Sequence, residues 1–276
     1  MGIWQQRPRD DHPTGRVVAF DIETVVEEEP VDGSFPPIPQ HRPVTAAFLG
    51  VTRSADGGHS FRLDVLVCRP GDEEQFYRKV DACLSPGVVG VGWNSRGFDL
   101  AVLRLRAMSH QCFGLEGLAR QAQSARYDTT HCDLADQFSG YGSSRTLSLA
   151  AVCEALQIPV KTSTHGSDVG ALWRAGDVDA VMRYVAEDTI ATWMCWLHWA
   201  AWKNADPAEM ALPLADFAVW LQTTPGLEPF RGFAECPPAR WALAQAPAVR
   251  ATRASTDVAR RLAQERDEQG FAANAL

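Results

Sequence analysis

The sequence predicts an α/β fold in which helices cover a mixed β-sheet. An apolar strand pattern comes first, a hairpin pattern follows it, and helical patterns fill most of the second half of the chain. The hairpin requires an antiparallel strand, and neither GxGxxG nor GxxxxGK[ST] occurs, so an all-parallel Rossmann sheet is not expected. The 276 residues fit one large domain with an addition.

The first half of the chain alternates strand and helix patterns. Residues 15–24 read GRVVAFDIET, whose central apolar run predicts a buried strand that ends in acids. A proline-containing loop at 25–43 leads to strand patterns at 44–52 and 59–68, joined by the turn sequence SADGG. The following patterns predict a helix at 72–84, a buried strand at 87–93, helices at 98–107 and 112–126, and an edge strand at 128–134.

The second half is predominantly helical in pattern. Helices are predicted at 147–158, where Pro159 stops the pattern, at 168–175, and at 177–204, the longest of all. Residues 205–248 are rich in Pro, Ala and Trp without clear periodicity, and 249–266 predict one charged helix.

Three parts of the chain follow from these patterns. Residues 1–15 are polar and predict a loose arm, 16–203 form the main domain, and 204–276 form an extension that we expect to be partly helical and partly disordered. Seven scattered cysteines without a CxxC pair argue against a zinc site or a disulfide framework. Reduced thiols, together with no apolar leader and no membrane-length apolar run, predict a cytoplasmic protein without membrane contact.

The acids at the end of the first strand are the first candidate site. Asp21 and Glu23 share one face of a strand, because side chains at i and i+2 point the same way. Tyr184 and Asp188 share one face of the longest helix. Asp99 stands near a helix start, after a buried strand. Taken singly, these features fit a strand running into solvent, a half-buried tyrosine beside an exposed acid, and a residue that complements a helix dipole.

Taken together, the acids predict a metal centre. Carboxylates from a strand end, a helix start and a late helix can converge only in the folded chain. Clustered carboxylates are costly unless a counter-charge neutralises them. Mg²⁺ and Mn²⁺ prefer such oxygen ligands, and two ions about 3.5–4 Å apart form a clamp for phosphodiester cleavage. The net charge of −8 argues mildly against nucleic acid, but bound cations reverse the field locally.

These motifs carry a family resemblance. FDIET, then N-x-x-x-F-D, then Y-x-x-x-D resemble the three exonuclease motifs of the DEDDy branch of the DnaQ-like, RNase H-fold nucleases. The middle motif most resembles the proofreading domain of family-B DNA polymerases. The resemblance covers about 16–203. Stretches similar to stand-alone relatives of that domain are FPPIPQHRPV (35–44), THCDLAD (130–136), and LQIPVK (156–161) followed by GSDV (166–169).

The resemblance implies a mixed five-stranded RNase H-like sheet and a free-standing exonuclease. Such an enzyme would hydrolyse DNA from its 3′ end, favour single strands, use two Mg²⁺ or Mn²⁺ ions and release nucleoside 5′-monophosphates. Asp21 would bridge both metals, and Glu23 and Asp188 would complete the site that activates water. Asp99 would serve the second metal largely through water. Tyr184 would orient, and could deprotonate, the attacking water.

Several further residues are candidate nucleic-acid contacts. The resemblance implies that Asn94 and Phe98 touch the terminal nucleotides, Phe98 by stacking. Candidate phosphate contacts are Arg96, Arg145, Lys161 and His165. Relatives often have Gly-Lys where this chain has Val160 and Lys161, so a surface lysine is an equal interpretation there. Asp133 and Asp136 fit either an acidic rim or an exposed strand end.

A tryptophan stripe marks the longest helical pattern. Trp193, Trp196, Trp199 and Trp202 repeat every three residues. Such a stripe is more typical of a core or an oligomer seam than of a base-stacking platform. We therefore expect the C-terminal segment or a partner chain to cover this helix.

Two alternatives to a DNA exonuclease remain open from the sequence. A 3′–5′ exoribonuclease would use the same metal site, and no residue here announces a 2′-hydroxyl contact. A non-catalytic nucleic-acid-binding or assembly module is the other alternative. The presence of all five motif residues argues against that module.

Overall fold

Five strands form one mixed sheet in the order β3-β2-β1-β4-β5. The computed structural model describes residues 15–28, 30, 34–54, 56–159 and 168–273. The strands are β1 (Arg16–Val25), β2 (Arg42–Arg53), β3 (His59–Val67), β4 (Val89–Gly92) and β5 (His131–Asp133). β2 is antiparallel to β1 and β3, whereas β4 is parallel to β1 and β5 to β4. The predicted mixed five-stranded sheet, with its hairpin and its edge strand, is confirmed.

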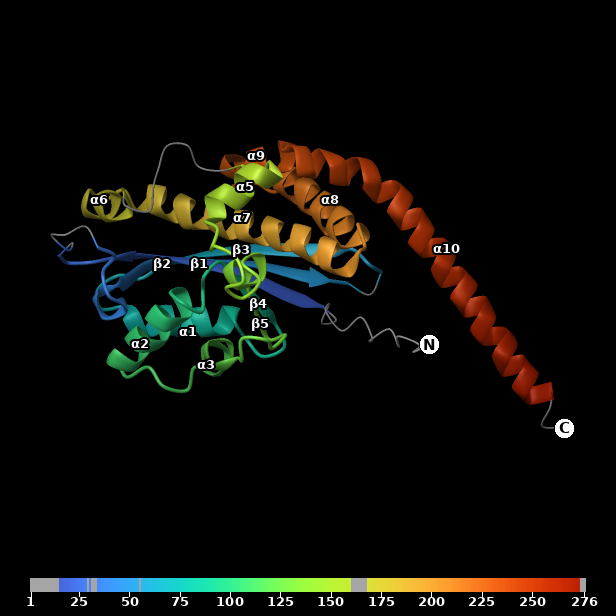
Figure 1. Cartoon of the computed structure of the whole chain (residues 1–276), viewed down its shortest axis with the longest axis horizontal. Helices are drawn as coiled ribbons and strands as arrows, with labels where there is room; N and C mark the ends of the chain where they lie inside the picture. The colour runs from blue at the N-terminus through green and yellow to red at the C-terminus, as the bar shows by residue number, and fades with distance from the viewer. Residues whose placement is uncertain (1–14, 29, 31–33, 55, 160–167, 274–276) are drawn as a thin grey trace.

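Helices cover both faces of the sheet (Figure 1). One layer contains α1 (Glu73–Cys83), α2 (Asp99–Ser109) and α3 (Glu116–Gln123). The other contains α5 (Leu149–Leu156), α6 (Val169–Arg174), α7 (Val178–Asn204), α8 (Ala208–Thr223), α9 (Arg231–Glu235) and α10 (Pro237–Ala273). The connections include α4 (Leu134–Phe138) and the 3₁₀ turns η1 (Ile38–Gln40) and η3 (Glu228–Phe230).

β1 is buried on both faces, which explains its continuous apolar run. Val17 and Ala19 belong to the core on the α7 side, while Val18 and Phe20 belong to the core on the α1 side. A strand with helices on both faces needs apolar side chains at successive positions, because these alternate between the two faces. The acids at the end of β1 therefore lie next to two packed cores.

The tryptophan stripe of α7 is core at one end and surface at the other. Trp193 and Trp196 are buried, and the core that contains them also contains much of α8. The expected cover by the C-terminal segment is confirmed for these two side chains, because α8 of the same chain belongs to that core. Trp199 is partly buried, and Trp202 is 81% exposed.

The segment 205–248 is more regular than the sequence suggested. It forms α8, α9 and the start of α10, and α10 extends away from the body in Figure 1. The sequence shows no clear periodicity here because α8 is buried on most of its surface, so its apolar residues form no single stripe. The helix predicted at 249–266 lies within α10. Among the described helices, none is both long and apolar enough to cross a membrane.

Candidate active site

Three acids converge where β1 meets α7. Asp21, Glu23 and Asp188 each offer a carboxylate oxygen within 4.8 Å of the others, and all three side chains are partly buried. Asp21 and Glu23 point to the same face of β1, as their spacing predicted. The structure therefore brings together two of the three sequence motifs in one cluster.

A contact between α7 and β2 sets the position of Asp188. The hydroxyl of Thr189, the next residue, donates to the carbonyl oxygens of Val185 at 2.8 Å and Ala47 at 3.4 Å. Ala47 lies directly opposite Asp21 in the β1–β2 ladder. Because Thr189 is fully buried, this contact fixes one turn of α7 above the acids of β1.

Tyr184 lies one helical turn before Asp188 and beside the acid cluster. Its ring packs with Val25 and Trp173 around a small apolar cluster. Burial raises the pKa of the Tyr184 hydroxyl, and the charges of Asp188 and Glu23 raise it further. The phenol therefore stays protonated beside these acids.

Asp99 lies beside the cluster but outside the group of three. It is the first residue of α2 and is 3% exposed. The backbone N–H of Ile22 donates to its Oδ1 atom at 3.1 Å. β4 pairs with β1 only as far as Ala19. The N–H group of Ile22 therefore lies beyond the β1–β4 pairing, and Asp99 accepts its hydrogen bond. Burial raises the pKa of Asp99 to about 7, and Asp133 adds to the rise.

The loop between β4 and α2 presents Asn94 and Phe98. Asn94 adopts a left-handed conformation with φ of 54°. Its side-chain oxygen would lie 2.7 Å from a Cβ atom at Gly97, so glycine permits this close approach. The backbone N–H groups of Asn94 and Arg96 donate to the two carboxylate oxygens of Asp133, each at 2.9 Å.

Asp133 has a structural role, which corrects the predicted acidic rim. Its side chain is 4% exposed. Besides its bonds to the β4–α2 loop, its Oδ1 atom accepts from Ala135 N at 3.1 Å and caps α4. Asp136 is bound by the guanidinium of Arg126. Asp133 is the N-cap of α4 and Asp136 lies in its first turn, so the sequence did not show that the strand is followed at once by a helix.

Arg96 is also committed to the fold. Its guanidinium donates to the carbonyl oxygens of Ser124, Ala125 and His131. Because these bonds join the motif loop to the segment before β5, we withdraw the interpretation of Arg96 as a phosphate contact. Arg145 is exposed in the α4–α5 loop. Lys161 and His165 lie outside the described residues.

An aromatic group beside Phe98 was missed by the analysis of the sequence. The ring centroid of Phe98 lies 4.8 Å from that of His41 and 5.6 Å from that of Phe35. His41 is held by Pro36 O at 3.0 Å and Thr24 Oγ1 at 2.8 Å. Phe35 is 71% exposed. The stretch 35–44 resembles stand-alone relatives, but its proline-rich pattern does not show that Phe35 and His41 pack against Phe98.

The donor set fits a hard divalent cation. The cluster offers carboxylate oxygens, with neither sulfur nor imidazole nitrogen among its three members. Mg²⁺ and Mn²⁺ prefer such oxygen ligands, whereas zinc sites usually include Cys or His. Asp99 adds a buried carboxyl group next to the same strand.

A family comparison assigns the domain. The model of a family described as "Predicted 3'-5' exonuclease related to the exonuclease domain of PolB" matches residues 33–233. The chain belongs to this family. The matched region includes Asp99, Tyr184 and Asp188 but begins after β1. Asp21 and Glu23 lie outside the match, and their carboxylates lie close to that of Asp188 in the structure. It also extends past the domain boundary that we placed at residue 203. No curated protein matches the chain.

The solved structures that are similar include exonuclease I. The E. coli enzyme in complex with a dT13 oligonucleotide is 13% identical, with a TM-score of 0.38, and the alignment covers 74% of this chain and 45% of that one. A product-bound exonuclease I is 16% identical, with a TM-score of 0.37 and coverages of 72% and 46%. The chain thus spans less than half of the exonuclease I length.

Proposed function

We propose that this 3′–5′ exonuclease domain degrades DNA from its 3′ end, favours single strands and depends on two divalent cations. The observation that carries the proposal is the convergence of Asp21, Glu23 and Asp188 within 4.8 Å. The family match supplies the class of reaction. The proposal adds the substrate, the metals and the products, which would be nucleoside 5′-monophosphates.

The acids divide into two metal-binding roles in this proposal. Asp21, Glu23 and Asp188 would hold one cation, and Asp21 and Asp99 would serve a second. The position of Asp99 outside the cluster of three is compatible with a contact to that cation through water. When bound, the cations supply a lowered pKa for the attacking water and stabilisation of the charge that develops on the phosphate.

Tyr184 positions the water in this scheme. Tyr184 would orient the nucleophile through its hydroxyl, whose pKa is raised by burial. Together with Asp188, one turn further along α7, it completes the Y-x-x-x-D pattern. We therefore propose that the enzyme belongs to the DEDDy branch.

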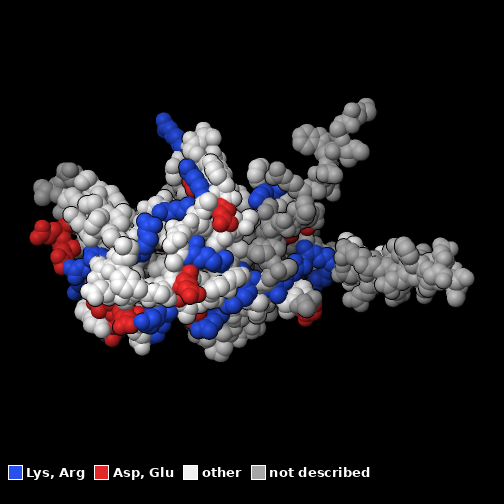
Figure 2. Space-filling view, turned by 90° about the horizontal axis from the view of Figure 1, so that it is seen from below, with Lys and Arg blue, Asp and Glu red and all other residues white. Residues whose placement is uncertain are grey.

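The terminal nucleotide would bind against the β4–α2 loop. Phe98 supports a base through its ring, backed by His41 and the exposed ring of Phe35. Asn94 is exposed at the same loop and offers its amide. Basic side chains are spread across the α1–α3 face, with acids between them (Figure 2). The overall negative charge is therefore compatible with local attraction of a phosphate backbone.

A degradation assay tests the proposal. 5′-Labelled single-stranded DNA, double-stranded DNA and RNA of one sequence are incubated with Mg²⁺, Mn²⁺ or EDTA. We expect a ladder that shortens from the 3′ end, fastest on single-stranded DNA, and no products in EDTA. Asp188→Ala serves as the matched inactive protein.

Each arm of the assay has an outcome that contradicts part of the proposal. Undiminished cleavage in excess chelator would overturn the metal assignment. Early release of labelled mononucleotide would indicate attack from the 5′ end. Faster cleavage of RNA would identify an exoribonuclease, and binding without cleavage under every condition would identify a non-catalytic module.

A further inference from the structure

Two tyrosines outside the candidate active site form a ring pair at the surface, with an angle of 55° between the ring planes. Tyr127 lies in the loop between α3 and β5 and is 75% exposed. Its ring centroid is 4.6 Å from that of Tyr141, in the loop between α4 and α5. A large aromatic ring exposed to this extent contributes little to the core. We call Tyr127 and Tyr141 the tyrosine platform.

The backbone of Tyr141 is held in an unfavourable conformation that fixes its ring. Its φ is 58°, a left-handed value that is rare for bulky residues, and it stands between Gly140 and Gly142, which also have positive φ. Its N–H donates to Asp136 O at 2.7 Å, and its hydroxyl accepts from Gln137 Nε2 at 2.8 Å. Strain of this kind persists where surrounding bonds enforce it, and it clusters at functional sites.

A cation accompanies the platform. The guanidinium carbon of Arg126 lies 5.5 Å from the ring centroid of Tyr141. Arg126 Nε also donates to Asp136 Oδ2 at 2.9 Å, which fixes the orientation of the guanidinium. Arg145 is exposed four residues after Tyr141. Stacking rings with adjacent arginines are the combination that binds single-stranded nucleic acid without sequence preference.

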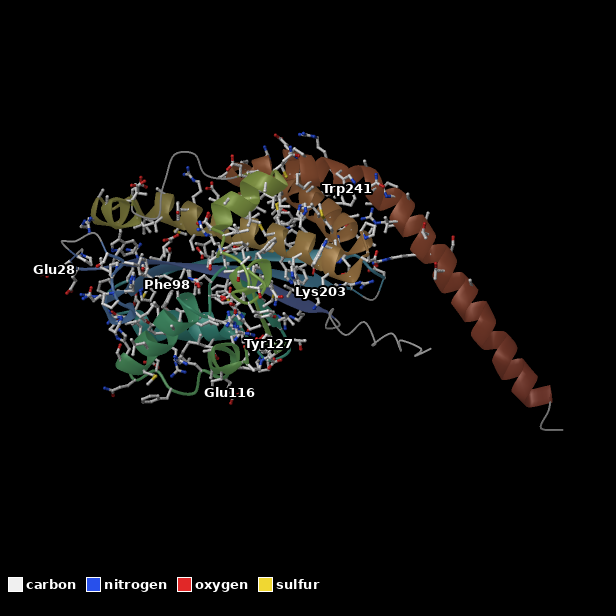
Figure 3. All side chains as sticks on the ribbon, in the orientation of Figure 1. Glu28, Phe98, Glu116, Tyr127, Lys203 and Trp241 are labelled. Atoms are coloured by element: carbon white, nitrogen blue, oxygen red, sulfur yellow. The ribbon has the colours of Figure 1, made fainter. Side chains whose placement is uncertain are left out.

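The platform is anchored to the loop that carries Asn94 and Phe98. Arg96 of that loop donates to Ser124 O and Ala125 O, immediately before Arg126 and Tyr127. Figure 3 shows Tyr127 near α3 and β5, on the side of the sheet where α2 lies. The bonds of Arg96 therefore hold the platform in a defined position relative to the proposed site of the terminal nucleotide.

We propose that the tyrosine platform is a second stacking subsite for the substrate strand. It takes bases that lie 5′ of the terminal nucleotide, with Arg126 and Arg145 near their phosphates. The subsite makes binding depend on the length of the strand, because a short oligonucleotide cannot reach from the acid cluster to Tyr127. This inference rests on the proposed function, since it assumes a single strand with its 3′ end at the cluster.

A length series tests the subsite. Affinities of 5′-fluorescent oligothymidylates of 2 to 12 nucleotides are measured by anisotropy in EDTA, with the full chain. For the unchanged protein we expect a rise in affinity above a threshold length. Tyr127→Ala should lose that rise and bind the longest strand about tenfold more weakly, with the shortest strands unaffected. Tyr127→Phe, which keeps the ring, should retain the rise.

Phe113→Ala is the matched control, because Phe113 is an aromatic residue exposed to 68% in the α2–α3 loop. A uniform loss in Tyr127→Ala at all lengths, or the same loss in Phe113→Ala, would overturn the subsite. If Tyr127→Ala fails to fold, the unchanged protein is crosslinked by ultraviolet light to strands that carry one 5-iodouridine. This experiment tests directly whether internal bases contact the tyrosine platform. We expect a crosslink to Tyr127 or Tyr141 from internal positions, and crosslinks confined to other residues would refute the proposal.

The degradation assay separates the two proposals. If the protein neither binds nor cleaves DNA, the proposed function fails. If it cleaves DNA from the 3′ end while Tyr127→Ala keeps the full length dependence, only the platform fails.

Discussion

The acid cluster at the end of β1 and the buried Asp133 at the end of β5 differ in how their negative charge is compensated. Asp21, Glu23 and Asp188 share one small volume, with their carboxylate oxygens within 4.8 Å of one another. Asp133 is more deeply buried, and three backbone N–H groups donate to its carboxylate. In the proposed enzyme a bound cation would relieve the mutual repulsion in the cluster, whereas backbone donors of the fold compensate Asp133.

A second buried polar group near Asp133 follows the same rule. His131 lies between Ser95 Oγ at 2.8 Å and Gln121 Oε1 at 3.2 Å. Burial lowers the pKa of His131 to about 3, so the ring is neutral and carries its proton on the nitrogen that faces Gln121 Oε1. Polar groups satisfied within the protein fix the loop around Asn94. The crowded acids, in contrast, form the site where the proposed function needs a cation.

Removal of a cluster acid should give the largest effect. Asp21→Ala or Asp188→Ala takes away a metal ligand and leaves the remaining acids poorly arranged for cations. We expect turnover to fall below detection, while the melting temperature in EDTA stays equal or rises because repulsion is reduced. Single-turnover rates and thermal melts measure both quantities. A large loss of stability in EDTA would show that the cluster supports the fold.

Tyr184→Phe should produce the next largest effect. The change keeps the ring and its packing but removes the hydroxyl. Orienting and proton-transfer groups contribute about 10²–10⁴-fold, so the variant should cleave slowly but measurably and bind DNA as before. Full activity would show that Tyr184 only packs, and the DEDDy assignment would then be withdrawn.

Asp133→Ala should affect stability more than chemistry. It leaves three backbone donors without their partner, at about 1–3 kcal/mol for each group that stays buried. We expect a loss of several kcal/mol and a melting temperature lowered by about 2–4 °C per kcal/mol. Asp136→Ala is the control, because it removes an ion pair with Arg126 in which the arginine is half exposed and should cost about 1 kcal/mol or less.

Asp99→Asn should reveal the cost of a buried charge through its pH dependence. The pKa of Asp99 is raised to about 7 from 3.8, so the folded protein binds a proton more tightly than the unfolded chain. The wild type therefore loses stability as pH rises from about 4 to 7. In EDTA, Asp99→Asn should melt at a higher temperature at pH 8, and the gain should shrink toward pH 4. A constant difference across this range would contradict the assignment.

Changes in the C-terminal helix should give the smallest effect. α10 holds no motif residue, and Arg253 lies by a pocket of about 360 Å³ beside α8. Arg250→Ala, Arg253→Ala, Arg260→Ala and Arg261→Ala should leave the cleavage rate at saturating substrate nearly unchanged. A loss comparable to that of Asp188→Ala would place the C-terminal extension in the chemistry.

Local spacing predicted most of the fold and the principal site. The alternation in β1 and the i, i+4 spacing of Tyr184 and Asp188 predict which side chains share a face. Strand and helix geometry fix the directions in which these side chains point. The strand and helix positions up to residue 204 follow the predicted order. Missed features, such as α4 and the helical course of 205–248, lack a periodic signal because they are short or buried on most sides.

The tertiary structure decided what each polar residue does. Asp99 and Asp133 each follow a short strand and lie at or next to the start of a helix. Only contacts with distant backbone groups tell their roles apart. Asp133 binds the backbone of the β4–α2 loop, whereas Asp99 binds the backbone of β1 beside its acids. The sequence made Arg96 a candidate phosphate contact, but its guanidinium donates hydrogen bonds to the carbonyl oxygens of Ser124, Ala125 and His131. Local periodicity in the sequence predicted most of the element order up to residue 204, and the resemblance to the nuclease family proposed the five motif residues. Long-range packing determined which charges are satisfied internally, because hydrogen-bond partners far apart in the chain meet only after folding.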